Sequence, residues 1–392
     1  MRHAPALIGK NTMRPPSRRG KEEAMLTVNK NDAITKLNRL IEDGRQNAGR
    51  VIEHVMQNQP QDFIVKANAL QFSGDGGLRV ALNGAEFGVH RFALGQIAEV
   101  ANLPVKFLDS LAGSEWGRAL IAHNLSQIFA HRDAKRHLVR TLNSEVRGFL
   151  SDSYRRLDSR PIIEAFVTGV QRLGALPYKG IVTDTKVAIQ AILPDVFDVI
   201  PGEVVAFVLS LENSDFGNGA LSLRVGALRI WCDNLAVFEE NMRQIHLGRR
   251  LDENIVFSQK TYLLDTKTTV SALEDIIGVQ LNREGLKRRM ELLAVTAQKA
   301  VDPQAAMRML KDSLGVGQAQ AVIDAYKSAD IEMLPAGNNA WRLSNAISWI
   351  GGREPDAEKK LELMKLAGRV LLPGSKGSDS IPFAAAEVVQ AA

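Results

Sequence analysis

The stretch GFLSDSYRRLD, residues 148–158, places two aspartates, a tyrosine and two adjacent arginines within eleven residues. Two carboxylates held together in a desolvated pocket can act as an acid–base pair. Arginines beside an aromatic ring can bind single-stranded nucleic acid through charge and base stacking. A third interpretation is structural, because Asp152 and Asp158 flank an expected turn, where backbone N–H groups and nearby arginines can satisfy both carboxylates.

Basic residues are concentrated around this stretch, since residues 131–160 contain eight Lys or Arg side chains against four acidic ones. We expect HLVRTL and VRGFLS to form a β-hairpin, so that Arg140 and Arg147 lie on its two strands. Directly after the second strand come Tyr154, Arg155 and Arg156. One edge of the protein could therefore present these five residues to single-stranded DNA. The alternative is a solvated hairpin whose arginines pair with surface acids.

Motifs of common catalytic sites are absent from the sequence. There is no GxxxxGK[ST] phosphate loop, no GxSxG elbow and no HExxH zinc motif. His123, His131 and His137 are spaced eight and six residues apart, which does not place metal ligands on one turn of a helix. Cys232, the single cysteine, ends an apolar strand, and we expect a small buried side chain there. The sequence names no catalytic residue, no metal and no cofactor, and it favours a non-enzymatic protein.

The helices and strands that we expect along the chain indicate an α+β protein. Short strands joined by Gly-rich turns precede a strand-rich central part, and beyond residue 265 the chain becomes helical. There Ser271 and Glu274 form a capping-box pattern, and Asp302 followed by Pro303 suits the start of another helix. Because strands and helices do not alternate strictly, we expect a central antiparallel or mixed sheet with flanking helices and a helical C-terminal region. The expected division is a disordered leader over 1–25, an N-terminal α+β part over 26–130, a central sheet-rich α+β domain over 131–264, a helical part over 265–372 and a flexible tail over 373–392.

The composition is that of an ordinary globular chain, with 392 residues, 45% hydrophobic and 24% charged residues, and a net charge of +5. Much of the excess charge lies in residues 1–25, which contain six basic and two acidic side chains. Bulk charge is therefore no evidence for DNA binding. No apolar run approaches the roughly 18 residues of a membrane helix, and a single cysteine excludes an internal disulfide. We expect a cytoplasmic protein without membrane contact.

Three stretches resemble motifs of the phage- and plasmid-related proteins called the domain of unknown function 932 family. The first is RTLNSEVRGFLSDSYRRLDSRPII, with Ser151, Asp152, Tyr154 and Asp158 at motif positions. The second is ENSDFGNGALSLRVGALRIWCDNL, with Asn213, Ser214, Asp215, Gly217, Arg229, Cys232 and Asn234. The third is NAWRLSNAISWI, with Trp341, Asn345 and Ala346. Asp215 stands where the family usually has glutamate, and Trp349–Gly352 replaces a Tyr- and His-containing end.

The resemblance implies an origin in a mobile element and no known reaction. It points to phage or plasmid DNA metabolism, so we expect a protein that binds or anneals single-stranded DNA in recombination or replication and self-assembles into a homo-oligomer. A second hypothesis is a non-enzymatic protein that binds and modulates a host factor, as anti-defence proteins do. An enzyme of another type is the third.

Trp341, Asn345 and Trp349 are spaced by four residues, so their side chains share one face of an expected helix. We expect both tryptophans to be buried against the central domain. Asn345 should hydrogen-bond the backbone within that contact. The alternative is a platform on which bases stack.

Overall fold

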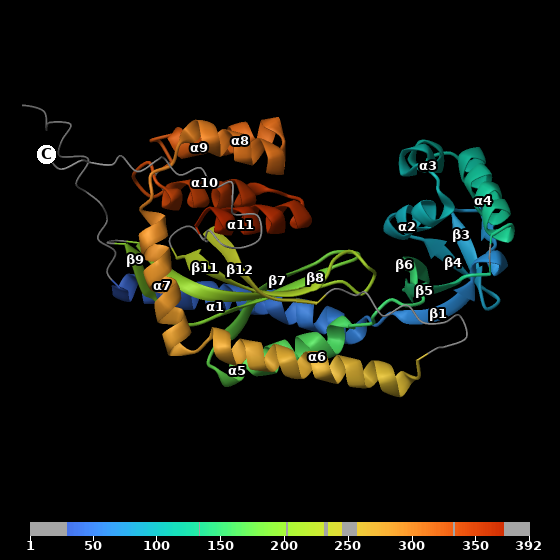
Figure 1. Cartoon of the computed structure of the whole chain (residues 1–392), viewed down its shortest axis with the longest axis horizontal. Helices are drawn as coiled ribbons and strands as arrows, with labels where there is room; N and C mark the ends of the chain where they lie inside the picture. The colour runs from blue at the N-terminus through green and yellow to red at the C-terminus, as the bar shows by residue number, and fades with distance from the viewer. Residues whose placement is uncertain are drawn as a thin grey trace, which may run out of the picture.

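The computed structural model describes residues 30–132, 134–200, 203–230, 234–244, 257–331 and 334–371 (Figure 1). The expected leader, the expected flexible tail and Cys232 lie outside these residues. Within them the α+β prediction is confirmed, because the chain forms two sheets of six strands and ends in a helical region. Figure 1 shows the two sheets toward opposite ends of an elongated molecule, with the C-terminal helices gathered around one of them.

The first sheet has the strand order β1-β5-β6-β4-β3-β2, and all its pairs are antiparallel except β4 with β6. Its strands are β1 (Gln61–Lys66), β2 (Phe72–Ser73), β3 (Arg79–Leu82), β4 (Ala85–Val89), β5 (Arg136–Leu142) and β6 (Glu145–Ser151), with a 3₁₀ turn η2 (Ala67–Ala69) after β1. One face packs against α2 (Arg91–Ala101) and α4 (Glu115–Ala130), and α3 (Val105–Ala112) packs on these two helices. The core of this contact includes Val139 and Phe149.

The expected hairpin is present as β5 and β6, joined at Asn143 and Ser144. Both turn residues have positive φ, 52° and 63°, which is the conformation that two-residue hairpin turns need. The hairpin pairs with β1 on one side and with β4 on the other. It therefore belongs to the first sheet, whereas from the sequence we expected it to lie in the central domain with the strands that follow. The partners of a strand can be distant in sequence, and no local pattern identifies them.

The second sheet has the order β12-β11-β10-β8-β7, with β9 also paired to β10. Its strands are β7 (Leu176–Val182), β8 (Val187–Ile192), β9 (Phe197–Ile200), β10 (Glu203–Asn213), β11 (Leu221–Arg229) and β12 (Asn234–Gln244). Alternate β10 residues enter two cores. Val205 and Phe207 pack with α5 (Ser159–Arg172) and the C-terminal helices, and Val204 and Ala206 pack with α1 (Lys30–Gln57). Burial on both faces explains why this strand is an uninterrupted apolar run.

The helical region contains α6 (Gln259–Gln280), α7 (Arg283–Ala297), α8 (Pro303–Leu314), α9 (Val316–Lys327), α10 (Ala340–Arg353) and α11 (Ala357–Leu371). The predicted helix start at Asp302 is confirmed, because its side chain accepts from the Gln304 N–H at the start of α8. The capping box predicted at Ser271 is wrong. Helix α6 begins earlier, where the Ser258 hydroxyl accepts from the Thr261 N–H, and Ser271 lies inside it.

Candidate functional site

The first two family-like motifs meet at the junction between the two sheets, and Arg140 on β5 bridges them. This side chain is only 1% exposed. Its Nε donates to Asp62 Oδ1 at 2.8 Å, its Nη2 to Asp158 Oδ1 at 2.6 Å and its Nη1 to the Asp215 carbonyl oxygen at 2.8 Å. Burial disfavours the guanidinium charge, but the carboxylates of Asp158, Asp62 and Asp215 outweigh it and raise the pKa of Arg140.

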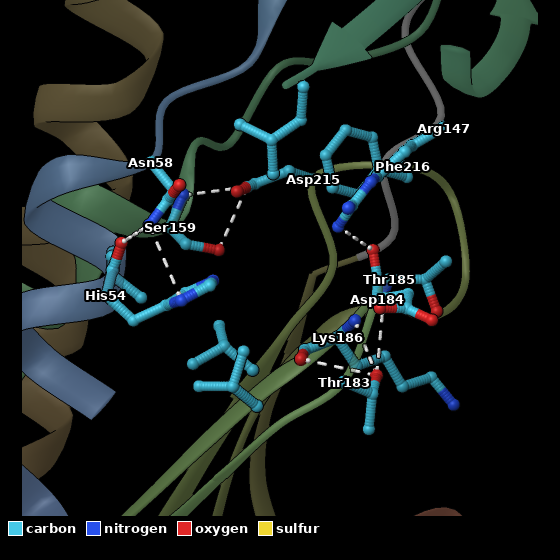
Figure 2. Close-up of a pocket in the computed structure, with 14 residues that line it drawn as sticks. His54, Asn58, Arg147, Ser159, Thr183, Asp184, Thr185, Lys186, Asp215 and Phe216 are labelled. Carbon is cyan, nitrogen blue, oxygen red and sulfur yellow. Dashed lines mark hydrogen bonds between the residues drawn. The ribbon is translucent and has the colours of Figure 1, made fainter. Parts of the chain in front are cut away.

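The start of α5 is held by the loop that follows β10. Asp158 occupies the N-cap position, yet its side chain makes no capping bond. Instead, Asp215 Oδ1 accepts from the Ser159 N–H at 2.8 Å and from its hydroxyl at 2.9 Å, as Figure 2 shows. Asn213 Nδ2 donates to the Leu157 carbonyl and to Ser159 Oγ, at 2.7 and 3.0 Å. The NSD stretch therefore caps a helix that belongs to the other motif.

Asp215 has the most perturbed carboxyl group of the junction. Burial raises its pKa to about 6. The Arg140 charge and the two bonds from Ser159 act against this rise, and the neighbouring Asp158 carboxylate adds to it. Such shifts are found at functional sites and also in structural ion-pair networks. Here the Asp215 carboxylate holds the start of α5 through its two hydrogen bonds from Ser159.

The backbone of the same loop is fixed by Ser214 and Gly217. The Ser214 hydroxyl donates to the Thr185 carbonyl at 2.8 Å, and the Tyr154 hydroxyl donates to the Ser214 carbonyl at 3.2 Å. Gly217 has φ +85°, and a Cβ there would lie 2.6 Å from Leu150 Cδ2. Only glycine combines that conformation with such a close approach. Burial raises the pKa of Tyr154, so this hydroxyl stays a donor at neutral pH.

The adjacent arginines reach two different elements. Arg155 makes a bidentate pair with Asp265 of α6, with Nη2 at 2.6 Å from Oδ1. The Arg156 Nε lies 2.6 Å from Asp62 Oδ2, and its guanidinium stacks 4.1 Å above the Tyr262 ring. Together they tie the N-terminal half of α6 and strand β1 to the motif segment.

Arg147 makes a second connection between the sheets. Its Nη1 donates to the Asp184 carbonyl in the turn after β7, at 3.2 Å, and its Nε pairs with Glu145. His90 at the start of α2 also lies 3.4 Å from the Asp184 carboxylate. Figure 2 shows Arg147 lying beside Asp184 and Phe216.

Ser151 and Asp152 lie at the outer end of the hairpin. Ser151 is exposed and shares a hydrogen bond of 2.7 Å with the Ser153 hydroxyl. Asp152 pairs with Arg136 at 3.4 Å. This matches the expectation that the aspartates of the motif are satisfied by neighbouring arginines, as Asp158 is by Arg140.

The five residues of the nucleic-acid hypothesis therefore do not share a solvent-facing edge. Arg140 and Tyr154 are buried. The other three, Arg147, Arg155 and Arg156, bind acidic or carbonyl oxygens of distant segments. What the structure brings together is a network that joins the two sheets, the helices α5 and α6 and the loop after β10.

The third family-like motif meets the end of the second motif at Glu203, a residue that lies outside all three motifs. Arg229 Nη2 donates to Glu203 Oε1 at 2.9 Å, and both side chains are more than nine-tenths buried. The Trp341 indole N–H donates to Glu203 Oε2 at 3.1 Å. Asn234 begins β12 opposite Arg229, and its side chain lies outside the described part of the structure.

The predicted burial of the tryptophan face is confirmed for Trp341, which is 2% exposed. Asn345 Nδ2 donates to the Trp341 carbonyl at 2.9 Å, so the predicted backbone hydrogen bond is present. Trp349 is half-buried, and the Arg353 guanidinium lies 3.6 Å above its ring. Arg353 therefore covers one face of the Trp349 ring.

The junction opens onto a cavity of about 570 Å³ between α5 and α6. Asp158 and Asp215 line it, but both carboxylates already accept hydrogen bonds from the protein. Within the described ranges, no three His, Cys, Asp or Glu side chains are grouped so that they could hold a metal ion. No helix of those ranges is long and apolar enough to cross a membrane.

Comparison of the chain with protein-family models, with curated proteins and with solved structures finds no match. The resemblance to the domain of unknown function 932 family therefore stays a prediction that rests on three short motifs. The geometry adds one fact about those motifs: the first two form one hydrogen-bonded junction, and the third shares Glu203 with the end of the second.

Proposed function

We propose that this protein binds single-stranded DNA. The binding surface is the end of the first sheet that carries Lys66, Lys135 and Arg136, and not the motif residues. Along β1, Phe63 and Val65 pack toward the helix-covered core. Side chains alternate along a strand, so Ile64 and Lys66 point to the opposite face. Ile64 is 42% exposed and Lys66 is exposed, which leaves an apolar and a basic group next to each other on the side of β1 away from the helices.

The observation that carries the proposal is a group of basic side chains at this end. Lys66 and Arg136 are direct cross-strand partners, and Lys135 is exposed beside them. Burial lowers the pKa of His137 first, and Lys135 and Arg132 lower it further, while the Asp152 carboxylate, which pairs with Arg136, acts in the opposite direction. Phosphates are attracted to exposed basic side chains such as Lys66 and Lys135, and an apolar neighbour can contact the unstacked bases of a single strand.

The test is oligonucleotide affinity as a function of salt. Lys66→Ala with Lys135→Ala should weaken binding of a labelled poly-dT oligonucleotide in fluorescence anisotropy. The salt slope of log affinity should flatten by about 1.4, because each lost phosphate contact on a single strand removes about 0.7. The matched control is Arg39→Ala with Arg50→Ala, which removes two exposed charges from α1. Equal effects of the two pairs, or no binding by the unchanged protein at low salt, would exclude the proposal.

A second candidate is the binding of a host protein, and exposed apolar side chains on α3 and α4 favour it. Trp116 is 67% exposed, Phe107 45% and Leu120 39%. Exposed apolar groups of this size are typical of protein contact surfaces. If the oligonucleotide experiment shows no binding, this candidate becomes the leading one. Self-assembly through the same helices would appear as a Trp116→Ala-sensitive oligomer in sedimentation analysis.

A further inference from the structure

Strand β1 forms one edge of the first sheet. In the described part of the chain its only strand neighbour is β5, and the register between the two strands is continuous, without a bulge. One residue past the end of β1, the Ala67 N–H donates to the Lys135 carbonyl at 2.8 Å. Along an antiparallel strand, residues that bond toward one neighbour alternate with residues that bond toward the other side. This bond therefore fixes which residues of β1 face β5 and which face outward.

The outward-facing residues of β1 are Asp62, Ile64 and Lys66, because Phe63 and Val65 share the direction of Ala67. Among the described residues, no backbone or side-chain group is hydrogen-bonded to the outward N–H and C=O groups of these three residues. An edge with such unpaired groups can accept a further strand, and many proteins cover or interrupt their edges for that reason. The outer side of β1 is thus a surface on which another strand can pair.

The sequence of β1, QDFIVK, complements itself when a second copy runs antiparallel to it. If Ile64 lies opposite Ile64 of the second copy, Phe63 lies opposite Val65 and Asp62 lies opposite Lys66. Pairs of aromatic with β-branched residues and pairs of opposite charge both stabilise neighbouring strands. The Asp62 carboxylate is already held by arginines of its own chain, so the apolar pairs carry most of this register. No like charges lie opposite each other in it.

Ile64 is the exposed end of an apolar row on the side of the sheet away from the helices. It lies opposite Leu138 of β5, which is fully buried and packs with Leu150 and Tyr154. Ile64 itself is 42% exposed. A second copy would continue this row with its own Ile64 and Leu138, and the two Ile64 side chains would remove each other from water.

We propose that two copies of this chain associate through β1, antiparallel and with a two-fold axis at Ile64, so that their first sheets become one continuous sheet. The same surface is used on both copies, and such an interface closes as a dimer. A contact one strand wide is smaller than the interfaces of about 1,200–2,000 Å² that hold stable complexes together. We therefore expect a dimer whose population rises with protein concentration.

Disulfide trapping of the full chain tests the geometry. Directly opposite, hydrogen-bonded residues of antiparallel strands have Cα atoms about 5.5 Å apart, within the distance of about 4.4–6.8 Å that a disulfide spans. Under mild oxidation Ile64→Cys should form a covalent dimer at least about tenfold faster than Val279→Cys, because the contact holds the two thiols together. Val279 is a suitable control because it is 60% exposed on α6. Cys232 is present in every variant, so the unchanged protein gives the background.

Sedimentation velocity without DNA measures the contact itself, at protein concentrations from about 1 µM to about 1 mM. Ile64→Lys places like charges opposite each other at the axis and should weaken association by about tenfold or more. Leu173→Lys, at a position 43% exposed after α5, is the matched control and should leave association within about twofold. Trp116→Ala should also leave it unchanged, which separates this dimer from assembly through α3 and α4.

Three results would overturn the proposal. The first is an unchanged protein that stays monomeric over the whole concentration range. The second is a covalent dimer that forms equally fast with Ile64→Cys and Val279→Cys, and the third is a dimer that Ile64→Lys does not weaken. Lys66 borders both this interface and the proposed DNA surface. Because association is measured without an oligonucleotide, its failure is distinguishable from failure of the DNA proposal.

Discussion

Asp215 accepts hydrogen bonds from both the N–H and the hydroxyl of Ser159, although 56 residues separate the two. The aspartate in the N-cap position, Asp158, is turned toward Arg140 instead. Asp215 thus connects α5 to the loop after β10 of the second sheet, and Asp158 connects it to β5 of the first sheet. The start of α5 is part of the junction, and the stability of that helix depends on the loop after β10.

Replacing Asp215 should show whether its carboxylate caps α5. Asp215→Ala should lower the free energy of unfolding by about 0.5–2 kcal/mol, the usual loss when a capping side chain is removed. Asp215→Asn keeps an oxygen that can accept from Ser159 and should lose less. Urea unfolding followed by circular dichroism measures both. Unfolding of the alanine variant at the same urea concentration as the unchanged protein would contradict the assignment.

The same residue predicts a pH dependence. The pKa of Asp215 is raised from 3.8 to about 6 in the folded protein, so the folded state binds this proton more readily than the unfolded chain. Its contribution to stability therefore falls as pH rises from about 4 to about 6 and is constant above that. The groups that face it are Arg140, Asp158 and Ser159.

The Asp215→Asn variant lacks this titration. Its free energy of unfolding, relative to the unchanged protein, should increase across the same pH window and then level off. Thermal or urea unfolding at several pH values between 4 and 7 measures the difference. A difference that stays constant over this range would show that Asp215 does not titrate there.

Arg140 should be among the least replaceable residues of the junction. Arg140→Met removes a buried cation from Asp62 and Asp158, whose side chains are 29% and 44% exposed, so we expect a loss of about 1–3 kcal/mol, below the about 3–5 kcal/mol of a fully buried pair. Arg160→Met, at a side chain that is 46% exposed, should stay within about 0.5 kcal/mol. Comparable losses in these two variants would argue against a special role of Arg140.

Glu203 should be more sensitive still, although it lies outside the three family-like motifs. Glu203→Gln leaves Arg229 without its carboxylate inside the second sheet, and we expect a loss of about 3–5 kcal/mol. Glu42→Gln on the exposed side of α1 is the control, with an expected change within about 0.5 kcal/mol. A Glu203→Gln variant as stable as the control would mean that the buried pair is not formed.

Local patterns in the sequence predicted much of the fold. The hairpin turn at Asn143 and Ser144 and the helix start at Asp302 depend only on neighbouring residues, and both were found where expected. The start of α6 was placed too late, at Ser271 instead of Gln259. The run TYLLDTKTT carries threonines that favour helices weakly, so contacts with α5 and with Arg155 must support this part of the helix.

The partners of the motif residues could not be predicted from the sequence. Arg140 bonds to Asp62, 78 residues away, Arg155 to Asp265, 110 away, and Trp341 to Glu203, 138 away. A run of arginines looks the same in a sequence whether it faces solvent or distant carboxylates. The folded arrangement decides between a binding edge and a junction, and here it favours the junction.

A double-mutant cycle on Arg155 and Asp265 tests most directly whether the motif arginines form an internal junction. The free energy of unfolding is measured by urea for the unchanged protein, for Arg155→Ala, for Asp265→Ala and for the double variant. The bidentate pair at 2.6 Å predicts a coupling energy of about 1 kcal/mol or more, within the range of about 0.5–3 kcal/mol for contacting residues. A coupling energy near zero, with additive losses, would contradict the account, because the arginine would then be open to a ligand.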